Sequence, residues 1–261
     1  MSASLRNIVD FSRYPLGKGE FRRTTYDTLN WDGVVVMEGF LLPQAIESIR
    51  HEGEKHRSQA YYCVQNHNVY LTPSDVVYPE DHPRNRQVRS SKGCITDDIV
   101  PVDSLLRTLY NDIDFREFLC AVLDEAALHS YADPLSSINI HYADEGQELG
   151  WHFDNSSFAI TLLIQSPQAG GEFEYVSAVR NAEAGEMNFE GVAEVLDGQT
   201  TPKTLTMTAG TLVLFRGRNA MHRVAPVRGS RTRMLVVLAY NAEPGISLSE
   251  SARMTFYGRL G

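Results

Sequence analysis

The pattern of apolar and polar positions changes character near residue 136. From there to residue 242, short runs rich in β-branched and aromatic residues alternate with Gly, Pro and Asn, a pattern that predicts strands and turns. The eight expected strands are SINIHYA, LGWHF, FAITLLIQ, GGEFEYV, KTLTMTA, TLVLFRG, AMHRVAPV and RMLVVLAYN. Such a series predicts a double-sheet jelly roll, whose side chains alternate between the inside and the outside.

The first half of the chain carries helical patterns. WDGVVVMEGFL predicts a strand, after which Pro43 marks the start of a helix over AIESIRHEGEKHRS. Another helix is expected from Asp103, a good N-cap, to residue 126, with a break near Asp112 to Asp114. We therefore predict an α+β, mainly β fold, in which a double-stranded β-helix (jelly roll) rests on an N-terminal helical layer.

Two segments interrupt these patterns. Residues 60–100 contain aromatics, prolines and the basic residues Arg84, Arg86, Arg89 and Lys92, which predicts a long ordered loop with short strands. Residues 176–199 are polar and contain Gly185 and Gly191. We expect a loop with one or two helical turns there, serving either as a lid or as a surface crossover between strands.

The length of 261 residues is compatible with one domain, because β-rich folds of this size often remain single. We expect 1–135 to provide the strand and helix support and an active-site loop. The jelly-roll core is expected at 136–242, and a tail at 243–261 is expected to close the pocket.

Composition and charge narrow the function. A net charge of −9 and a pI near 5.4 disfavour a nucleic-acid groove or an anionic membrane surface. The three cysteines are scattered, which is typical of reduced thiols. No apolar run approaches a membrane span, and the N-terminal MSASLRNIVDFSRY lacks a signal core, so we expect a cytoplasmic protein.

The candidate chemistry begins at the strand LGWHF. His152 and Asp154 are two residues apart, a spacing that places both side chains on one face of a strand. His222, on a later strand, offers a third ligand. Two histidines and one carboxylate on one face of an octahedron bind Fe(II) and leave positions open for a cosubstrate and O2.

Several segments around these residues resemble the Fe(II)/2-oxoglutarate-dependent oxygenases. The matching segments, in order, are His152-x-Asp154, Gly170-Gly171-Glu172-Phe173, AGTLVLF from Ala209, and HRVAPV from His222 followed by Gly229 and two arginines. The opening WDGVVVMEGFLLPQAIESI is similar to the N-terminal layer of that family. GWHFDNSSFAITLLIQ, GGEFEYV and MTFYGR most resemble its compact group that hydroxylates or halogenates free amino acids.

The resemblance implies Fe(II) as the metal and 2-oxoglutarate and O2 as cosubstrates, which become succinate and CO2. The distal carboxylate of 2-oxoglutarate requires a cation, and a guanidinium offers two parallel hydrogen bonds. Arg233 stands at the strand position that the family uses, and Arg231 is the reserve. Tyr142 and Thr161 are further candidates for this cosubstrate, although a core tyrosine is an equally good interpretation of Tyr142.

Asp154 also bears on the reaction. In related halogenases the corresponding residue is Gly or Ala, which frees a coordination position for chloride. The carboxylate of Asp154 fills that position, so we expect hydroxylation of a carbon–hydrogen bond, or desaturation, and not halogenation.

For the substrate we expect a small molecule, and specifically a free amino acid. Asn155, Arg89 and Tyr257 are the candidates to contact it, with Phe256, Arg84 and Arg86 as further possibilities. One alternative keeps the chemistry but changes the substrate to a natural product, a nucleotide or a protein side chain. Another is a non-catalytic, cupin-like metal-binding module, which would have no need of a buried arginine.

Overall fold

The computed structural model of the chain describes residues 4–261. The first three residues of the N-terminal segment, from which the cytoplasmic location is predicted, lie outside this range. Among the described residues, no helix has both the length and the apolar character that crossing a membrane requires.

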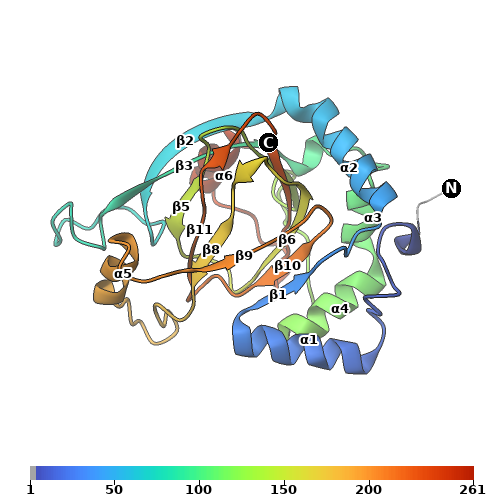
Figure 1. Cartoon of the computed structure of the whole chain (residues 1–261), viewed down its shortest axis with the longest axis horizontal. Helices are drawn as coiled ribbons and strands as arrows, with labels where there is room; N and C mark the ends of the chain where they lie inside the picture. The colour runs from blue at the N-terminus through green and yellow to red at the C-terminus, as the bar shows by residue number, and fades with distance from the viewer. Residues whose placement is uncertain (1–3) are drawn as a thin grey trace.

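Most strands of the protein form one curled antiparallel sheet (Figure 1). Its strands are β1 (Val34–Met37), β2 (Tyr61–Asn68), β3 (Gln87–Ile95), β4 (Ile138–Ala143), β5 (Leu149–His152), β6 (Ala159–Gln165), β8 (Phe173–Val176), β9 (Lys203–Leu205), β10 (Leu212–Phe215), β11 (Met221–Val224) and β13 (Arg233–Leu238). The short strands β7 (Ala169–Gly170) and β12 (Val227–Arg228) form a separate pair.

The order of the strands shows how the sheet closes. They follow one another as β1-β10-β6-β13-β4-β3-β5-β11-β8-β9, and β2 pairs with β3. The turn between the two faces of the roll occurs at β3, which pairs with both β4 and β5. All eight strands expected between residues 136 and 242 have counterparts in the structure, and the predicted jelly roll is confirmed.

Strands from the first half of the chain complete the roll. β1 extends the sheet next to β10, and β3 joins its two faces. Residues 60–100 are therefore more regular than expected, because β2 and β3 pair over their whole common length from Tyr61 opposite Cys94 to Asn68 opposite Gln87. The expected long loop is limited to 69–86.

The helices lie mostly on one side of the sheet, as Figure 1 shows for α1 to α4. Their side chains join those of β4, β6 and β13 in the largest apolar core. The helices are α1 (Gly19–Asp32), α2 (Pro43–His56), α3 (Leu105–Asn111), α4 (Ile113–Leu123), α5 (Phe189–Leu196) and α6 (Glu250–Tyr257), with short 3-10 turns at Leu5–Asn7, Arg57–Gln59 and Asp97–Ile99.

Local sequence explains where these helices begin. Pro43 occupies the first turn of α2, where its missing N–H costs nothing. The expected break near Asp112 is confirmed, because its carboxylate accepts from the backbone N–H of Asp114 and Phe115 and so caps α4. The preceding helix is capped by Ser104 and not, as expected, by Asp103. Helix α1 was not predicted.

The segment 176–199 contains α5, in agreement with the expected one or two helical turns. The helix packs through Val192 and Val195 against an apolar cluster with Tyr70, Phe153 and Met221. It lies on the side of the sheet away from α1 to α4 (Figure 1). The segment therefore packs against both the loop 69–86 and the strands that carry the candidate metal ligands.

Candidate active site

His152 and His222 face each other across two neighbouring strands. They are direct partners in the register of β5 and β11, and their ring centres lie 4.1 Å apart. The Nδ1 atom of His152 lies 2.9 Å from the carbonyl oxygen of Gly150, and that of His222 lies 3.0 Å from the carbonyl oxygen of Ala220. A carbonyl can only accept, so each ring donates from Nδ1 and leaves Nε2 free to bind a metal.

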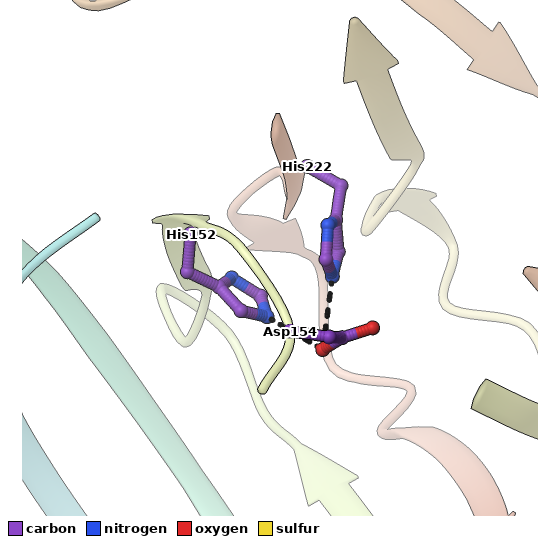
Figure 2. A group of neighbouring side chains, drawn as sticks. All are labelled: His152, Asp154 and His222. Atoms are coloured by element: carbon purple, nitrogen blue, oxygen red, sulfur yellow. Dashed lines mark ion pairs between the residues drawn. The ribbon is translucent and has the colours of Figure 1, made fainter. Parts of the chain in front are cut away.

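Asp154 completes this group from just beyond the end of β5. Its Oδ1 atom lies 3.8 Å from Nε2 of His152 and 3.5 Å from Nε2 of His222, and Figure 2 shows both rings directed at the carboxylate. The other oxygen, Oδ2, is buried without a hydrogen-bond partner among residues 4–261. A buried carboxylate oxygen without a partner is costly, and a bound cation would remove that cost.

The ionisation of these residues suits a divalent cation. Burial, with the neighbouring His222, lowers the pKa of His152 to about 3, so the imidazole is neutral near pH 7. Burial alone would raise the pKa of Asp154, but His222 and His152 lower it by more, and the carboxyl therefore ionises more readily than usual. One ligand atom from each of the three residues lies within 4.8 Å of the others. This donor set fits the facial triad of a non-haem iron site.

Two neighbouring residues hold Asp154 in place. Its backbone N–H donates to the carbonyl oxygen of Gly217 at 3.1 Å. Arg180, from the segment 176–199, stacks over the ring of Phe153 at 4.1 Å and donates to the backbone oxygens of Asp154 and Arg218. Neither Gly217 nor Arg180 was predicted as part of the site, because no sequence motif links them to the ligands.

The candidate ligands open onto a cavity of about 280 Å³ inside the roll. Its wall is mostly apolar and includes Leu71, Leu149, Met207, Val213, Phe215 and Val224. Asp154 is the only acidic side chain in the wall among residues 4–261. A cavity of this kind keeps bulk water away from the metal position and strengthens electrostatic interactions inside it.

Two of the four residues expected to bind 2-oxoglutarate line this cavity. Arg233, at the start of β13, is buried, and burial lowers its pKa to about 10. No carboxylate within residues 4–261 forms an ion pair with it. Thr161, on β6, lies opposite Val213 and Val237, which also line the cavity.

The other two expected residues point elsewhere. Arg231 is exposed and donates to the carbonyl oxygen of Pro167 at 2.8 Å. Tyr142 lies on the outer face of the sheet, where its hydroxyl donates to the carbonyl oxygen of Gly53 in α2 at 2.7 Å. This position fits the alternative interpretation of Tyr142, a core tyrosine with a bonded hydroxyl, because adjacent strand residues face opposite sides and its neighbour His141 is the one in the cavity wall.

The three residues expected to contact the substrate do not line the cavity either. Asn155 and Arg89 are exposed, the latter on the outer side of β3. Tyr257 is buried, and its hydroxyl donates to Oδ1 of Asn139 at 2.9 Å. The adjacent residue of α6, Phe256, lines the cavity instead.

Sequence reasoning missed two further polar side chains of the cavity wall. His141 on β4 and Lys92 on β3 both line it, and Nζ of Lys92 lies 3.2 Å from Nε2 of His141. The sequence pattern assigns Lys92 to the basic residues of a long ordered loop with short strands. The available signal was its place in SSKGCI, where small and apolar neighbours indicate a buried strand.

The sequence was compared with models of protein families and with curated proteins. Residues 27–255 match the model of the family described as HalD, Halogenase D. A comparison with curated proteins gives no match.

Solved structures with similar folds cover most of the chain. An oxidoreductase of the 2OG-Fe(II) oxygenase family from Burkholderia pseudomallei is 14% identical, with a TM-score of 0.54 over 88% of this chain and 94% of that chain. The α-ketoglutarate-dependent carbocyclase SnoK from nogalamycin biosynthesis is 12% identical, with a TM-score of 0.60 over 88% and 90%. The epimerase SnoN from the same biosynthesis is 10% identical, with a TM-score of 0.60 over 85% and 81%. At these identities the likeness shows the fold.

Proposed function

The chain belongs to the family described as Halogenase D, and we propose that it is an Fe(II)/2-oxoglutarate-dependent oxygenase that hydroxylates a small molecule. The observation that carries the proposal is the group His152, Asp154 and His222, directed into a partly enclosed cavity that also holds Arg233, which forms no ion pair within residues 4–261. A metal-binding module without turnover has no need of that arginine.

The three ligands would hold Fe(II) through Nε2 of each histidine and the carboxylate of Asp154. When bound, the iron with 2-oxoglutarate and O2 supplies the oxidising chemistry and yields succinate and CO2. The chain fixes the orientation of the ligands, because both Nδ1 atoms donate to backbone carbonyls and the backbone of Asp154 is tied to Gly217. The apolar wall excludes water.

Arg233 would bind the distal carboxylate of 2-oxoglutarate. Its guanidinium is enclosed and uncompensated, so a carboxylate brings it both a counter-charge and two parallel hydrogen bonds. The hydroxyl of Thr161 is a further donor to this carboxylate. Val213 and Val237 flank Thr161 and would contact the methylene groups of the cosubstrate.

Hydroxylation is the proposed outcome because Asp154 supplies a carboxylate as the third ligand. The position that halogenases of this kind keep open for chloride is then filled. Halogenation is the second candidate, favoured by the family match itself. The two reactions give different products, since one adds an oxygen atom to the substrate and the other replaces hydrogen by chlorine.

A free amino acid remains the proposed substrate class, on the basis of the sequence resemblance. The volume of about 280 Å³ and the partly enclosed shape of the cavity favour a small molecule over a protein side chain. Arg84 and Arg86 are engaged elsewhere, the first with the carbonyl oxygen of Pro73 and the second with Asp197. The residues that recognise the substrate must therefore be sought in the cavity wall.

The test is product analysis by mass spectrometry with Fe(II), ascorbate, 2-oxoglutarate, O2 and chloride, using a panel of free amino acids and amine-free organic acids. Gain of one oxygen by a panel member, lost in Asp154→Ala and His222→Ala, would support hydroxylation. Gain of chlorine by the wild-type protein would support the second candidate. Absence of 2-oxoglutarate consumption on a broad panel, despite stoichiometric iron binding, would overturn the oxygenase proposal.

A further inference from the structure

Lys92 places a second cation in the cavity wall, apart from Arg233. It lies in the middle of β3, and its side chain faces the cavity together with Cys63 and Gln65 of the paired strand β2. The ring of Phe256 from α6 covers it, with Nζ 5.7 Å from the ring centre. The ammonium group is thus held between the sheet and the C-terminal helix, and the space it faces is the cavity.

No carboxylate among the described residues pairs with this ammonium group. None of the ion pairs within residues 4–261 includes Lys92, and its one polar contact is with the ring of His141 at 3.2 Å. Burial, followed by the charges of Lys92 and Arg233, lowers the pKa of His141 well below its usual value, so the ring is neutral. A neutral imidazole accepts one hydrogen bond, which leaves two of the three ammonium protons unused.

Burial without an anion is unfavourable for the charged form of Lys92. Burial lowers its pKa, and only the nearby thiols Cys94 and Cys63 act in the opposite direction. Two cations that form no ion pair within residues 4–261, in the wall of one partly enclosed cavity, are a costly arrangement for stability alone. Such an arrangement indicates that ligands bring the missing negative charge.

The sheet register places the two cations on the same face. Gly93 of β3 lies opposite Tyr142 of β4, and Arg233 of β13 lies opposite the next residue, Ala143. Lys92 and Arg233 therefore stand in one row on either side of β4, and their backbones are separated by two strand spacings, about 10 Å. Each can bind its own carboxylate in the same cavity.

With the metal and cosubstrate of the proposed function in place, the sum of the charges in the cavity indicates different ligands for Arg233 and Lys92. Fe(II) held by two neutral histidines and Asp154 carries a single net positive charge. A dianionic 2-oxoglutarate balances that charge and one of the two cations. One cation is then left over, so a further carboxylate is required.

We infer that Lys92 binds a carboxylate in the cavity and that the substrate is an organic acid held through it. The inference rests on the proposed function and specifies its substrate class. The carboxylate bound by Lys92 could belong to the substrate or to 2-oxoglutarate. The test therefore measures the binding of each acid separately. An amino group on the substrate is not required, because no acidic side chain other than Asp154 lines the cavity among residues 4–261.

The experiment uses the full chain loaded with Zn(II), which occupies the site without turnover. Binding of 2-oxoglutarate is measured by calorimetry, and butyrate is then titrated into the Zn(II)/2-oxoglutarate complex, with butanol as the control that lacks a carboxylate. The variants are Lys92→Met and Lys92→Gln, which remove the charge, and Lys92→Arg, which keeps it. Arg89→Met, an exposed cation of the same strand, is the matched control.

We expect both neutral variants to weaken butyrate binding by roughly tenfold to a hundredfold, the range for a lost charge-assisted hydrogen bond. Binding of 2-oxoglutarate should change less than about twofold, and Lys92→Arg should restore most of the butyrate affinity. Weakened 2-oxoglutarate binding with unchanged butyrate binding would keep the carboxylate role of Lys92 but overturn the substrate assignment. Unchanged binding of both acids would overturn the inference, as would butanol binding that also depends on Lys92.

The melting temperature shows whether Lys92 binds a ligand or instead stabilises the fold. Without ligands, Lys92→Met should raise the melting temperature, because it removes a partly buried charge that has no ion pair within residues 4–261. A lower melting temperature together with unchanged carboxylate binding would show that Lys92 serves the fold. If the wild-type protein bound butyrate through Lys92 but neither bound nor consumed 2-oxoglutarate, the proposed function would fail while the anion site stood.

Discussion

Gly217 lies against the carboxylate of Asp154 so closely that a β-carbon at residue 217 would come 1.9 Å from Oδ2. The same glycine accepts a hydrogen bond from the backbone N–H of Asp154. The absence of a side chain at residue 217 thus lets the loop after β10 lie directly behind the candidate metal ligand. Any larger residue must displace the carboxylate or the loop.

Gly217→Ala should therefore weaken metal binding while leaving the fold intact. We expect at least about a tenfold loss of Fe(II) affinity, comparable to the loss of an outer-shell partner of a metal ligand. The measurement is anaerobic Fe(II) titration, with far-ultraviolet circular dichroism to check the fold. Gly19→Ala is the matched control, because an added β-carbon there meets nothing within 4 Å. Equal metal affinity in the two variants would contradict the proposed role of Gly217.

Arg233→Met should reduce the affinity for 2-oxoglutarate by roughly a hundredfold, since two charge-assisted hydrogen bonds are lost. Arg231→Met should have almost no effect, because that side chain is exposed and donates only to the carbonyl oxygen of Pro167. Calorimetric titration of both Zn(II)-loaded variants checks this pair. A larger effect at Arg231 than at Arg233 would show that the cosubstrate is bound outside the cavity.

Asp154→Gly should change the outcome of the reaction and not merely abolish it. Removal of the carboxylate leaves one coordination position for an external anion, so we expect loss of the hydroxylated product and, in chloride or bromide buffer, formation of a halogenated one. Mass spectrometry distinguishes the products. A buffer without halide is the control, and halogenation by the wild-type protein would show that the interpretation of Asp154 is mistaken.

The metal ligands could be predicted because their geometry follows from local spacing. His152 and Asp154 are close in sequence, and His222 lies on a strand whose pattern places it in the same roll. The motifs shared with the Fe(II)/2-oxoglutarate-dependent oxygenases indicate Arg233 as the cation for the distal carboxylate of 2-oxoglutarate. These signals do not depend on the exact pairing of distant strands.

The residues around the ligands were harder to predict because a shift of one position reverses a strand residue from inside to outside. On β4 the sequence indicates Tyr142, whereas His141 faces the cavity. On α6, where the next residue of a helix also points in another direction, the sequence favours Tyr257, whereas Phe256 lines the cavity. Lys92 lies inside only because β3 joins the two faces of the roll. That role depends on pairing between segments far apart in sequence.

Glu52 provides a test of stability that is independent of the active site. This residue of α2 is partly buried, and its Oε1 accepts a hydrogen bond from Ser104, the N-cap of α3, at 2.8 Å. Burial raises its pKa, aided by the charge of Asp103 and opposed by the Ser104 hydrogen bond and by Arg107. The folded protein therefore holds the proton more tightly than the unfolded chain does.

The sign of the pH dependence follows from this raised pKa. The contribution of Glu52 to stability is fully present below the unfolded carboxyl pKa, about 4.3. It is lost as the pH rises through the higher folded pKa. Glu52→Gln cannot ionise, and its amide oxygen can still accept from Ser104. We therefore expect a higher melting temperature for the variant near pH 7 and no difference below about pH 4.

Thermal unfolding of both proteins across this pH range checks the prediction. Glu54→Gln on the same helix is the control, because Glu54 is exposed and pairs with Arg50, so its loss should bring no gain near pH 7. A gain of equal size at both ends of the range would assign the effect of Glu52→Gln to packing. In that case ionisation of Glu52 would not limit the stability of the contact between α2 and α3.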